Sequence, residues 1–130
     1  MIQKLVNKFN VSQANINYYR NKKFNCLSNI EMENFGKGQK LDIEVNKIAG
    51  TTRVDINAKT FEEFIDTFHR DCLLSKSIDD LSKIISEPNN GYPEIYFYNG
   101  EYYLCGDGKH RIIIALLIGI SKMPVIVYKD

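Results

Sequence analysis

The chain has 130 residues, of which 44% are hydrophobic and 25% are charged, and its formal net charge is +1. A chain of this size and apolar content buries one core, so we expect one domain spanning 1–130, and the small net charge excludes a uniformly basic nucleic-acid coat. Three cysteines without Cys-x-x-Cys spacing argue against a disulfide framework, and no apolar run reaches the roughly 18 residues of a membrane span, so we expect a soluble cytoplasmic protein without a membrane partner.

Residues 1–25 are predicted to form a helical N-terminal segment ahead of a core that spans about 40–130. Ile2, Leu5 and Phe9 follow the period of an amphipathic helix, and a second apolar stretch ends at Tyr19. The segment contains basic residues and no acidic one, whereas the chain after residue 60 is net acidic. We interpret the basic residues either as a solvated helix face or as a basic arm. They are Lys4, Lys8, Arg20, Lys22 and Lys23.

The same segment resembles a helix-turn-helix, with the turn at Asn10–Ser12 and the recognition helix at Gln13–Arg20. Asn10 would take the left-handed turn position that is usually glycine, a conformation that asparagine tolerates. Val6 stands where a small residue is expected at the helix crossing, which favours an ordinary helical hairpin covering the sheet. If the motif binds DNA, the expected base and phosphate contacts are Gln13, Asn15, Asn17, Lys22 and Lys23.

The middle of the chain is predicted to contain a loop, a strand and two helices. Asn21–Lys40 is rich in Asn, Lys and Gly and is expected to be mostly loop, and Leu41–Val45 alternates as a half-buried strand does. Thr60 begins a capping box, so a helix is expected from there to about Leu74. Ser77 repeats this start signal for a second helix, which ends before a Pro-Asn-Asn-Gly sequence.

The C-terminal part has the clearest local signals. Asn99–Gly100 joins two aromatic strands as a type I′ hairpin, because both turn positions need positive φ. The turn Gly106–Gly108 precedes a helix through Leu117, which is apolar on all sides and is therefore expected to be buried. Gly119 is the expected C-cap, and Pro124–Tyr128 is the expected final strand. The predicted fold class is α+β with a small mixed sheet.

The turn and first helical residues at Gly106–Arg111 bring together groups that bind anions. A helix start presents free backbone amides and the positive end of the helix dipole, and Lys109–Arg111 adds three basic side chains. Phosphate suits such a site, because arginine can bind it bidentately and Gly108 lets the backbone approach closely. A buried helix capped by Asp107 or Gly108, with cations that only face solvent, is the alternative interpretation.

The segment Tyr103–Arg111, followed by Ala115 and Pro124–Val127, resembles the signature of the ParB/sulfiredoxin-like superfamily. That signature consists of a strand, a D-G-x-H-R or G-x-x-R turn, a buried helix and an I-P-V-I-V strand. Leu41–Arg53 is similar to the first strand of the family and the arginine-bearing loop after it. The resemblance covers 40–130 and implies a ParB/sulfiredoxin-like fold in which the buried helix follows the turn.

Members of this superfamily bind nucleoside triphosphates at the G-x-x-R turn, so the resemblance implies ATP or CTP with Mg²⁺ and a phosphotransferase or triphosphatase activity. The implied phosphate ligands are Gly106, Gly108, Lys109, His110, Arg111 and, facing them, Arg53. The implied catalytic residues are Lys109, His110 and Asp107. The candidates for a metal ligand or a base are Asp107, Glu44 and Asp55. The alternatives are that Asp107 only caps the helix and that Glu44 and Asp55 only face solvent.

The chain also departs from the family. Sulfiredoxins have a cysteine before the His-Arg pair, and Lys109 stands there, so we do not expect reduction of sulfinic acids. Cys105 is expected to pack as a small buried residue, and His69, placed on a polar helix face, receives no function. His110 is either a general base or a hydrogen-bonding group for a phosphate or a carbonyl.

Three functions therefore compete at the level of sequence. The first is a standalone nucleotide-binding domain, and the second is a small regulator that binds DNA through its basic N-terminal segment. The third is an interaction protein that keeps the fold without catalysis and binds a protein partner.

Overall fold

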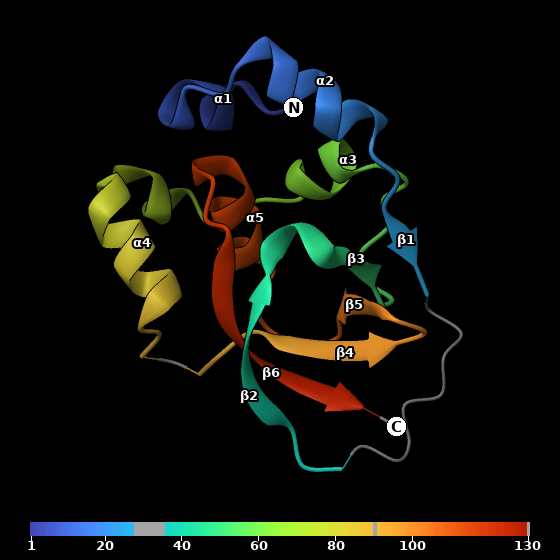
Figure 1. The fold of residues 1–130 in the computed structure, drawn as a ribbon. Coiled ribbons are helices and arrows are strands. Elements are labelled where there is room, and N and C mark those ends of the chain that lie inside the picture. Colours follow the sequence, from blue (N-terminus) through green and yellow to red (C-terminus); the bar gives the residue numbers. More distant parts are fainter. Residues whose placement is uncertain (28–35, 90, 130) are drawn as a thin grey trace.

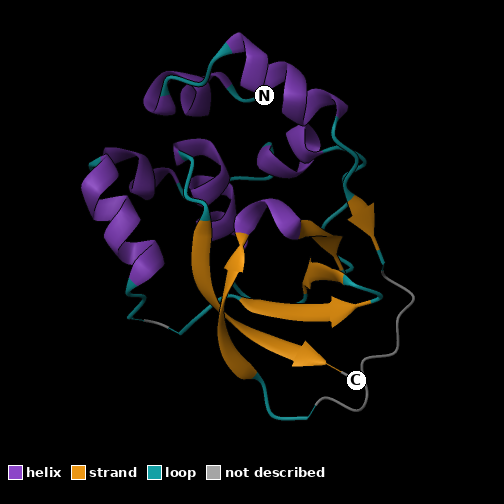
Figure 2. Ribbon diagram, in the orientation of Figure 1, coloured by secondary structure: helices purple, strands orange, loops and turns teal. Residues whose placement is uncertain are grey.

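The computed structural model describes residues 1–27, 36–89 and 91–129 of the chain. It is an α+β fold whose helices are gathered on one side of a mixed six-stranded sheet (Figure 1 and Figure 2). In chain order the elements are α1 Gln3–Phe9, α2 Gln13–Asn21, β1 Asn25–Cys26, β2 Gln39–Glu44, the 3₁₀ helix η1 Val45–Lys47, β3 Ile48–Thr51, α3 Phe61–Ile65, the 3₁₀ helix η2 Asp71–Ser75, α4 Ile78–Ser86, β4 Glu94–Tyr98, β5 Glu101–Leu104, α5 Lys109–Ile118 and β6 Lys122–Lys129.

The sheet has the strand order β1-β3-β5-β4-β6-β2. β4 pairs antiparallel with β5 and β2 antiparallel with β6, whereas the β1/β3, β3/β5 and β4/β6 pairs are parallel. The predicted hairpin is confirmed, because Asn99 and Gly100 have φ angles of 54° and 82°, as a type I′ turn requires. The predicted final strand is β6, which lies between β4 and β2.

α5 is the buried helix expected from its sequence, and it lies between α4 and α3 in the view of Figure 1. The side chains of Ile112–Ala115 are at most 1% exposed, so apolar residues on several faces of the helix are covered. Burying one isoleucine side chain stabilises a fold by about 1.5–3 kcal/mol, so this helix is held firmly in the core. Gly119 ends the helix with a φ of 78°, as predicted. α4 beside it begins at the predicted cap, Ser77.

α1 and α2 form the helical hairpin predicted for the N-terminal segment, but the prediction that it covers the sheet is wrong, because it packs on α3 and α5 (Figure 1). Asn10 between them has a φ of 51° and a ψ of 48°, the left-handed conformation expected of it. Ser12 caps α2, because its side chain accepts a hydrogen bond from the N–H of Asn15. The hairpin packs on the core through Tyr19, whose hydroxyl donates to the carbonyl of Leu116 in α5 at 3.0 Å.

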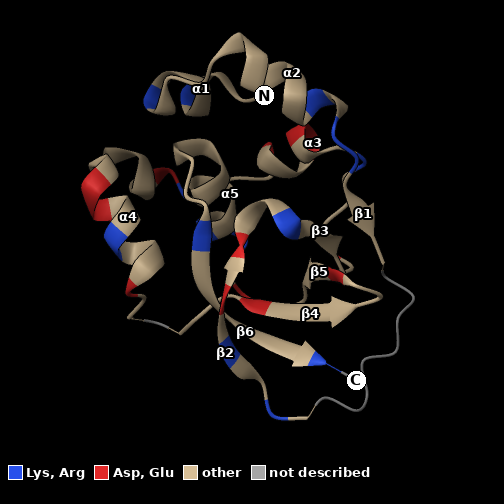
Figure 3. Cartoon of the chain, in the orientation of Figure 1, with Lys and Arg blue, Asp and Glu red and all other residues tan. Residues whose placement is uncertain are grey.

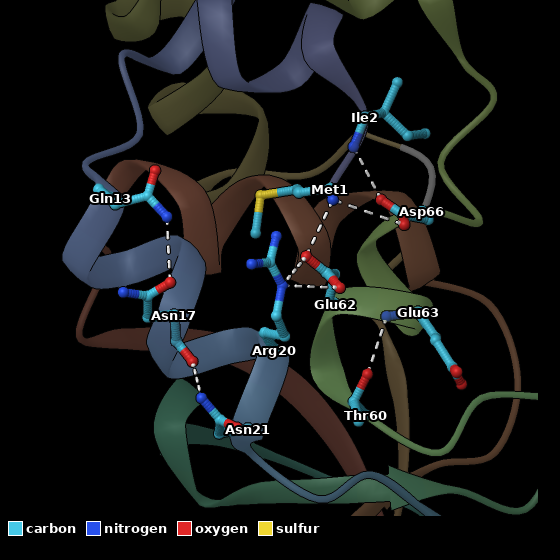
Figure 4. Close-up of polar contacts among 10 residues, drawn as sticks. All are labelled: Met1, Ile2, Gln13, Asn17, Arg20, Asn21, Thr60, Glu62, Glu63 and Asp66. Carbon is cyan, nitrogen blue, oxygen red and sulfur yellow. Dashed lines mark hydrogen bonds and ion pairs between the residues drawn. The ribbon is translucent and has the colours of Figure 1, made fainter.

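Basic residues of the N-terminal segment meet acidic residues from later in the chain. Nε of Arg20 donates to Oε2 of Glu62 at 3.1 Å, and the amino group of Met1 binds the same carboxylate (Figure 4). Lys4 pairs with Asp71. Figure 3 shows the blue end of α2 beside the red part of α3. The pair between Lys4 and Asp71 is exposed on both sides and stabilises the fold by about 0–1 kcal/mol, whereas the carboxylate of Glu62 is partly buried.

The prediction of a helix from Thr60 to about Leu74 is correct at its start and wrong after Ile65. Thr60 caps α3 as predicted, but the helix ends at Ile65. Thr67 accounts for the early end, because its amide and its hydroxyl both donate to the carbonyl of Phe64. In a continuing α-helix that carbonyl would accept from the N–H of Phe68, which donates to the carbonyl of Ile65 instead, so the turn tightens and the helix stops.

Two short strands, β1 and β3, are absent from the sequence-based prediction. β1 lies within the stretch 21–40 that was expected to be loop, and 28–35 of that stretch lie outside the described residues. β3 packs very close to β1, since a Cβ on Gly50 would lie 1.8 Å from the carbonyl oxygen of Asn25. The strand expected at 41–45 is β2, and Val45 begins η1 instead.

Candidate functional site

A cleft of about 560 Å³ lies where the start of α5 faces the linker between α3 and η2, residues 66–70. The loop after β3 and the end of α4 complete its walls. Its charged side chains are Arg53, Asp55, Arg70, Glu87, Asp107, Lys109 and Arg111. The predicted residue Arg53 and the predicted turn at 107–111 therefore line one cavity, although they are far apart in the sequence.

The turn before α5 is built around a glycine and a carboxylate. Gly108 is the N-cap and has a φ of 122°, a conformation that side chains rarely adopt, and no side chain caps the helix. Asp107 is therefore not the cap, but its N–H donates to Oε1 of Glu94 at 3.2 Å. Gly106 lies against the same carboxylate. The first amides of α5 have no partner within the helix, so they remain available to an anion.

The positively charged side chains of Lys109 and Arg111 donate hydrogen bonds only to neutral groups among the described residues. Nζ of Lys109 donates to the carbonyl of Thr67 at 3.2 Å, and Nη1 of Arg111 donates to the carbonyl of Gly91. Burial lowers the pKa of both groups, and the charge of Arg53 lowers the pKa of Lys109 further. A lowered pKa shows that the charged form is destabilised here, so an anion placed between these groups would be bound favourably.

Arg53 is largely neutralised by Asp55. Nε and Nη2 of Arg53 bind the two carboxylate oxygens, with Nε at 2.9 Å from Oδ1. Nη1 donates to the carbonyl of Gly106 at 3.3 Å, which fixes the guanidinium beside the turn. The hydrogen-bonded pair raises the pKa of Arg53 and lowers the pKa of Asp55. Both oxygens of Asp55 are thus already engaged.

His110 and His69 form a stacked pair on the cleft wall, with ring centroids 4.3 Å apart. Nδ1 of His69 lies 2.8 Å from Nε2 of His110, and the backbone N–H of His69 donates to the same Nε2 at 3.3 Å. Burial and then the charge of Lys109 lower the pKa of His110 to about 4, so this imidazole is neutral near pH 7. The sequence-based placement of His69 on a helix face is wrong, because α3 ends before it.

The acidic candidates do not all reach the cleft. Glu44 is absent from its lining and pairs with Lys47 at 3.0 Å. Asp107 and Glu87 line the cleft, and within the described ranges no group of three or more His, Cys, Asp or Glu could hold a metal ion by itself. Mg²⁺ that is bound mainly through phosphate oxygens needs only one or two carboxylates from the protein, and these two fit that role.

The residues expected to contact DNA lie on α2 and just after it. The side chains of Gln13 and Asn17 bind each other at 3.0 Å (Figure 4). Nζ of Lys22 lies 4.5 Å from the ring centre of Phe61, a cation–π contact that competes with binding to a phosphate. The two remaining candidates are exposed: Asn15 and Lys23.

Several cleft residues were not predicted from the sequence. His69 and Arg70 lie in the 66–70 linker, and Glu87 follows α4. The linker meets α5 only in the folded chain, so local periodicity and turn patterns cannot place it at a site. Two adjacent basic residues shortly after an apolar stretch, within an acidic part of the chain, are the pattern that could have drawn attention to His69 and Arg70.

No family model matches the chain, and neither a curated protein nor a solved structure matches it. None of the helices in the described ranges is both long enough and apolar enough to cross a bilayer. Basic side chains, free helix amides and an imidazole pair surround the cavity described above.

Proposed function

We propose that the chain binds the phosphate groups of a nucleoside triphosphate in this cleft. The observation that carries the proposal is that Lys109 and Arg111, at the start of α5, donate to backbone carbonyls and, in the described parts of the chain, to no carboxylate. A polyphosphate supplies the missing counter-charge and also accepts hydrogen bonds from the first amides of the same helix.

The roles divide by position. Arg111 and the α5 amides hold phosphate oxygens, and Lys109 binds the terminal phosphate as a point charge. Arg70, exposed at the cleft wall, adds a second guanidinium. Asp107 serves a Mg²⁺ ion that arrives with the nucleotide, because it lines the cleft beside the phosphate-binding turn.

Size and polarity support a nucleotide over a bare phosphate ion. The volume of about 560 Å³ lies in the range of cavities that bind small organic ligands. Leu73, Ile84 and Pro88 also line the cleft, so an apolar surface is present for the nucleoside. The resemblance of Tyr103–Arg111 to the ParB/sulfiredoxin-like superfamily supports the same assignment, and on that basis we propose the finer ParB/sulfiredoxin-like fold class and a phosphotransferase or triphosphatase activity.

The test is a thermal-shift panel of ATP, CTP, GTP and UTP with Mg²⁺, followed by calorimetry with any nucleotide that stabilises the protein. A ligand that binds the native state raises the melting temperature by mass action. We expect the wild type to respond and Arg111→Ala to lose the response. Lys122→Ala, which removes an exposed cation from β6, is the matched control and should respond like the wild type.

No shift with any nucleotide would overturn the proposal. A shift that Arg111→Ala retains in full would place the nucleotide elsewhere on the chain. Inorganic triphosphate alone separates the phosphate contribution from the nucleoside contribution, because it lacks the part that Leu73, Ile84 and Pro88 would contact.

A second candidate is DNA binding by the N-terminal hairpin, favoured by the left-handed Asn10 between α1 and α2. Its test is retention on DNA at increasing salt, since a protein that neutralises several phosphates loses affinity steeply. Lys23→Ala should weaken retention if this second function is correct. Absence of both nucleotide and DNA binding would favour the interaction protein.

A further inference from the structure

Two nitrogen atoms of His69 approach a single nitrogen atom of His110. The backbone N–H of His69 donates to Nε2 of His110 at 3.3 Å, and Nδ1 of the His69 ring lies 2.8 Å from the same atom. A backbone N–H can only donate, so Nε2 of His110 must present a lone pair. The proton of the neutral His110 ring is then on Nδ1.

This assignment fixes the other ring as well. Because Nε2 of His110 carries no proton, the contact at 2.8 Å is a hydrogen bond only if Nδ1 of His69 carries one and donates it. Nε2 of His69 is consequently the unprotonated nitrogen. In the described ranges it has no hydrogen-bond partner, and His69 is exposed and lines the cleft.

We propose that His69 is the proton acceptor of the cleft, and that His110 is the positioning residue that holds it in the reactive tautomer. The inference rests on the proposed binding of a nucleoside triphosphate and adds the group that activates its hydrolysis. The low pKa of His110, caused first by burial and then by the charges of Lys109, His69, Arg70 and Arg53, keeps the ring neutral, as a lone pair on one of its nitrogens requires.

The step balances without any further reagent. A water molecule donates a hydrogen bond to Nε2 of His69 and attacks the terminal phosphorus, and the water proton passes to that nitrogen. A new oxygen–phosphorus bond forms while the bond from phosphorus to the bridging oxygen breaks, so a nucleoside diphosphate and inorganic phosphate leave. Lys109 and Arg111 offset the charge on the phosphate oxygens, and the imidazolium then loses its proton to solvent.

The first experiment reads the tautomers directly by long-range proton–nitrogen NMR of the free protein, at a pH at which both rings are neutral. We expect the proton on Nδ1 in both histidines. His110→Gln keeps an acceptor near the position of Nε2 and should leave His69 protonated on Nδ1. His110→Phe has no acceptor there, so the proton of the neutral His69 ring should move to Nε2. A proton on Nε2 of His69 in the wild type would overturn the proposal.

The second experiment measures phosphate release from whichever triphosphate the thermal-shift panel selects, with Mg²⁺ present. His69→Asn keeps an amide donor near the position of Nδ1 but has no basic nitrogen, so kcat should fall at least about 100-fold while calorimetry gives an unchanged Kd. His110→Gln should keep most of the turnover that His110→Phe loses, a difference that packing alone would not produce.

The outcomes separate the two proposals. A wild type that binds the nucleotide but never releases phosphate would overturn the role of His69 and leave the binding site intact. Turnover that survives His69→Asn would do the same. A wild type that binds no nucleotide would overturn the binding proposal itself, and the role of His69 with it.

Discussion

Gly108 lies against Pro93 so closely that a Cβ on Gly108 would be 2.4 Å from the Cβ of Pro93. Pro93 is buried directly before β4, and its carbonyl accepts a hydrogen bond from Ile126 in β6. The backbone of Gly108 at the start of α5 therefore packs directly on the rigid ring of Pro93, which is fixed to the sheet. This contact sets where the helix amides and Lys109 point.

The first prediction is that Gly108→Ala both destabilises the fold and weakens nucleotide binding. The φ of 122° would strain the backbone of an alanine, and the alanine Cβ would clash with Pro93. We therefore expect a loss of about 2 kcal/mol or more in the free energy of unfolding. Gly119→Ala is the control, because Gly119 also has a positive φ but open space around it. That variant should lose only about 1 kcal/mol and bind normally. Urea denaturation and calorimetry measure both effects, and equal losses in the two variants would contradict the role of Pro93.

The second prediction concerns the ion pair between Arg53 and Asp55. Asp55→Asn removes a negative charge from the cleft and frees Arg53, so triphosphate should bind about two- to five-fold more tightly at low salt. Asp42→Asn, on the exposed side of β2, is the control and should change nothing. Calorimetry with inorganic triphosphate is the measurement. Weaker binding to Asp55→Asn would show that the carboxylate itself holds the ligand, for example through a metal ion.

The third prediction is a pH dependence of stability that comes from His110. Its pKa is about 4 in the folded protein, against 6.5 for an ordinary histidine. Between these values the unfolded chain binds a proton that the folded chain does not, so the free energy of unfolding falls as the pH falls through this window. The ring is partly exposed, so we discount the effect for screening to about 1 kcal/mol.

Urea denaturation of the wild type and His110→Gln, at about pH 7 and at about pH 4.5, isolates this contribution. Acidic groups that titrate in both proteins cancel in the comparison, and the wild type should lose more stability on acidification. An equal loss in the two proteins would show that His110 is as easily protonated as an exposed histidine.

The fourth prediction is that Cys105 is inert in the native protein. Burial and then the charge of Glu94 raise the pKa of its thiol to about 12, and the side chain is only partly accessible. The thiolate is the reactive form, so alkylation at about pH 8 should modify exposed Cys72 much faster than Cys105. Mass spectrometry of the digested protein gives both rates. Comparable rates would contradict the packing function that the sequence predicts for Cys105.

Features with a complete local signal are predictable from this sequence. The hairpin at Asn99–Gly100 and the caps at Thr60 and Ser77 each depend on residues a few positions apart, and the structure has all of them. The left-handed conformation of Asn10 belongs to the same group, since it follows from the chemistry of one side chain.

Features that depend on distant contacts are not predictable in the same way. The position of the linker after α3 depends on Lys109, whose Nζ donates to the carbonyl of Thr67, 42 positions earlier in the chain. β3 is a strand because it pairs in parallel with β1 and β5, although its own sequence is short and contains Gly50. The contact between His69 and His110 spans 41 positions, so no local pattern could reveal a tautomer that one ring imposes on the other.

Two facing walls of the cleft have separate origins in the chain. The wall at the start of α5 belongs to the run from β4 to β6, whereas His69 and Arg70 belong to a linker that contributes no strand to the sheet. By the proposed roles, a substitution of His69 in that linker would therefore change turnover, whereas the start of α5 on the other wall would keep its position. In a chain built in this way, substitutions in the linker could change the catalytic activity while the ligand-binding residues at the start of α5 stay the same. Ligand binding and catalysis could therefore diverge among related sequences.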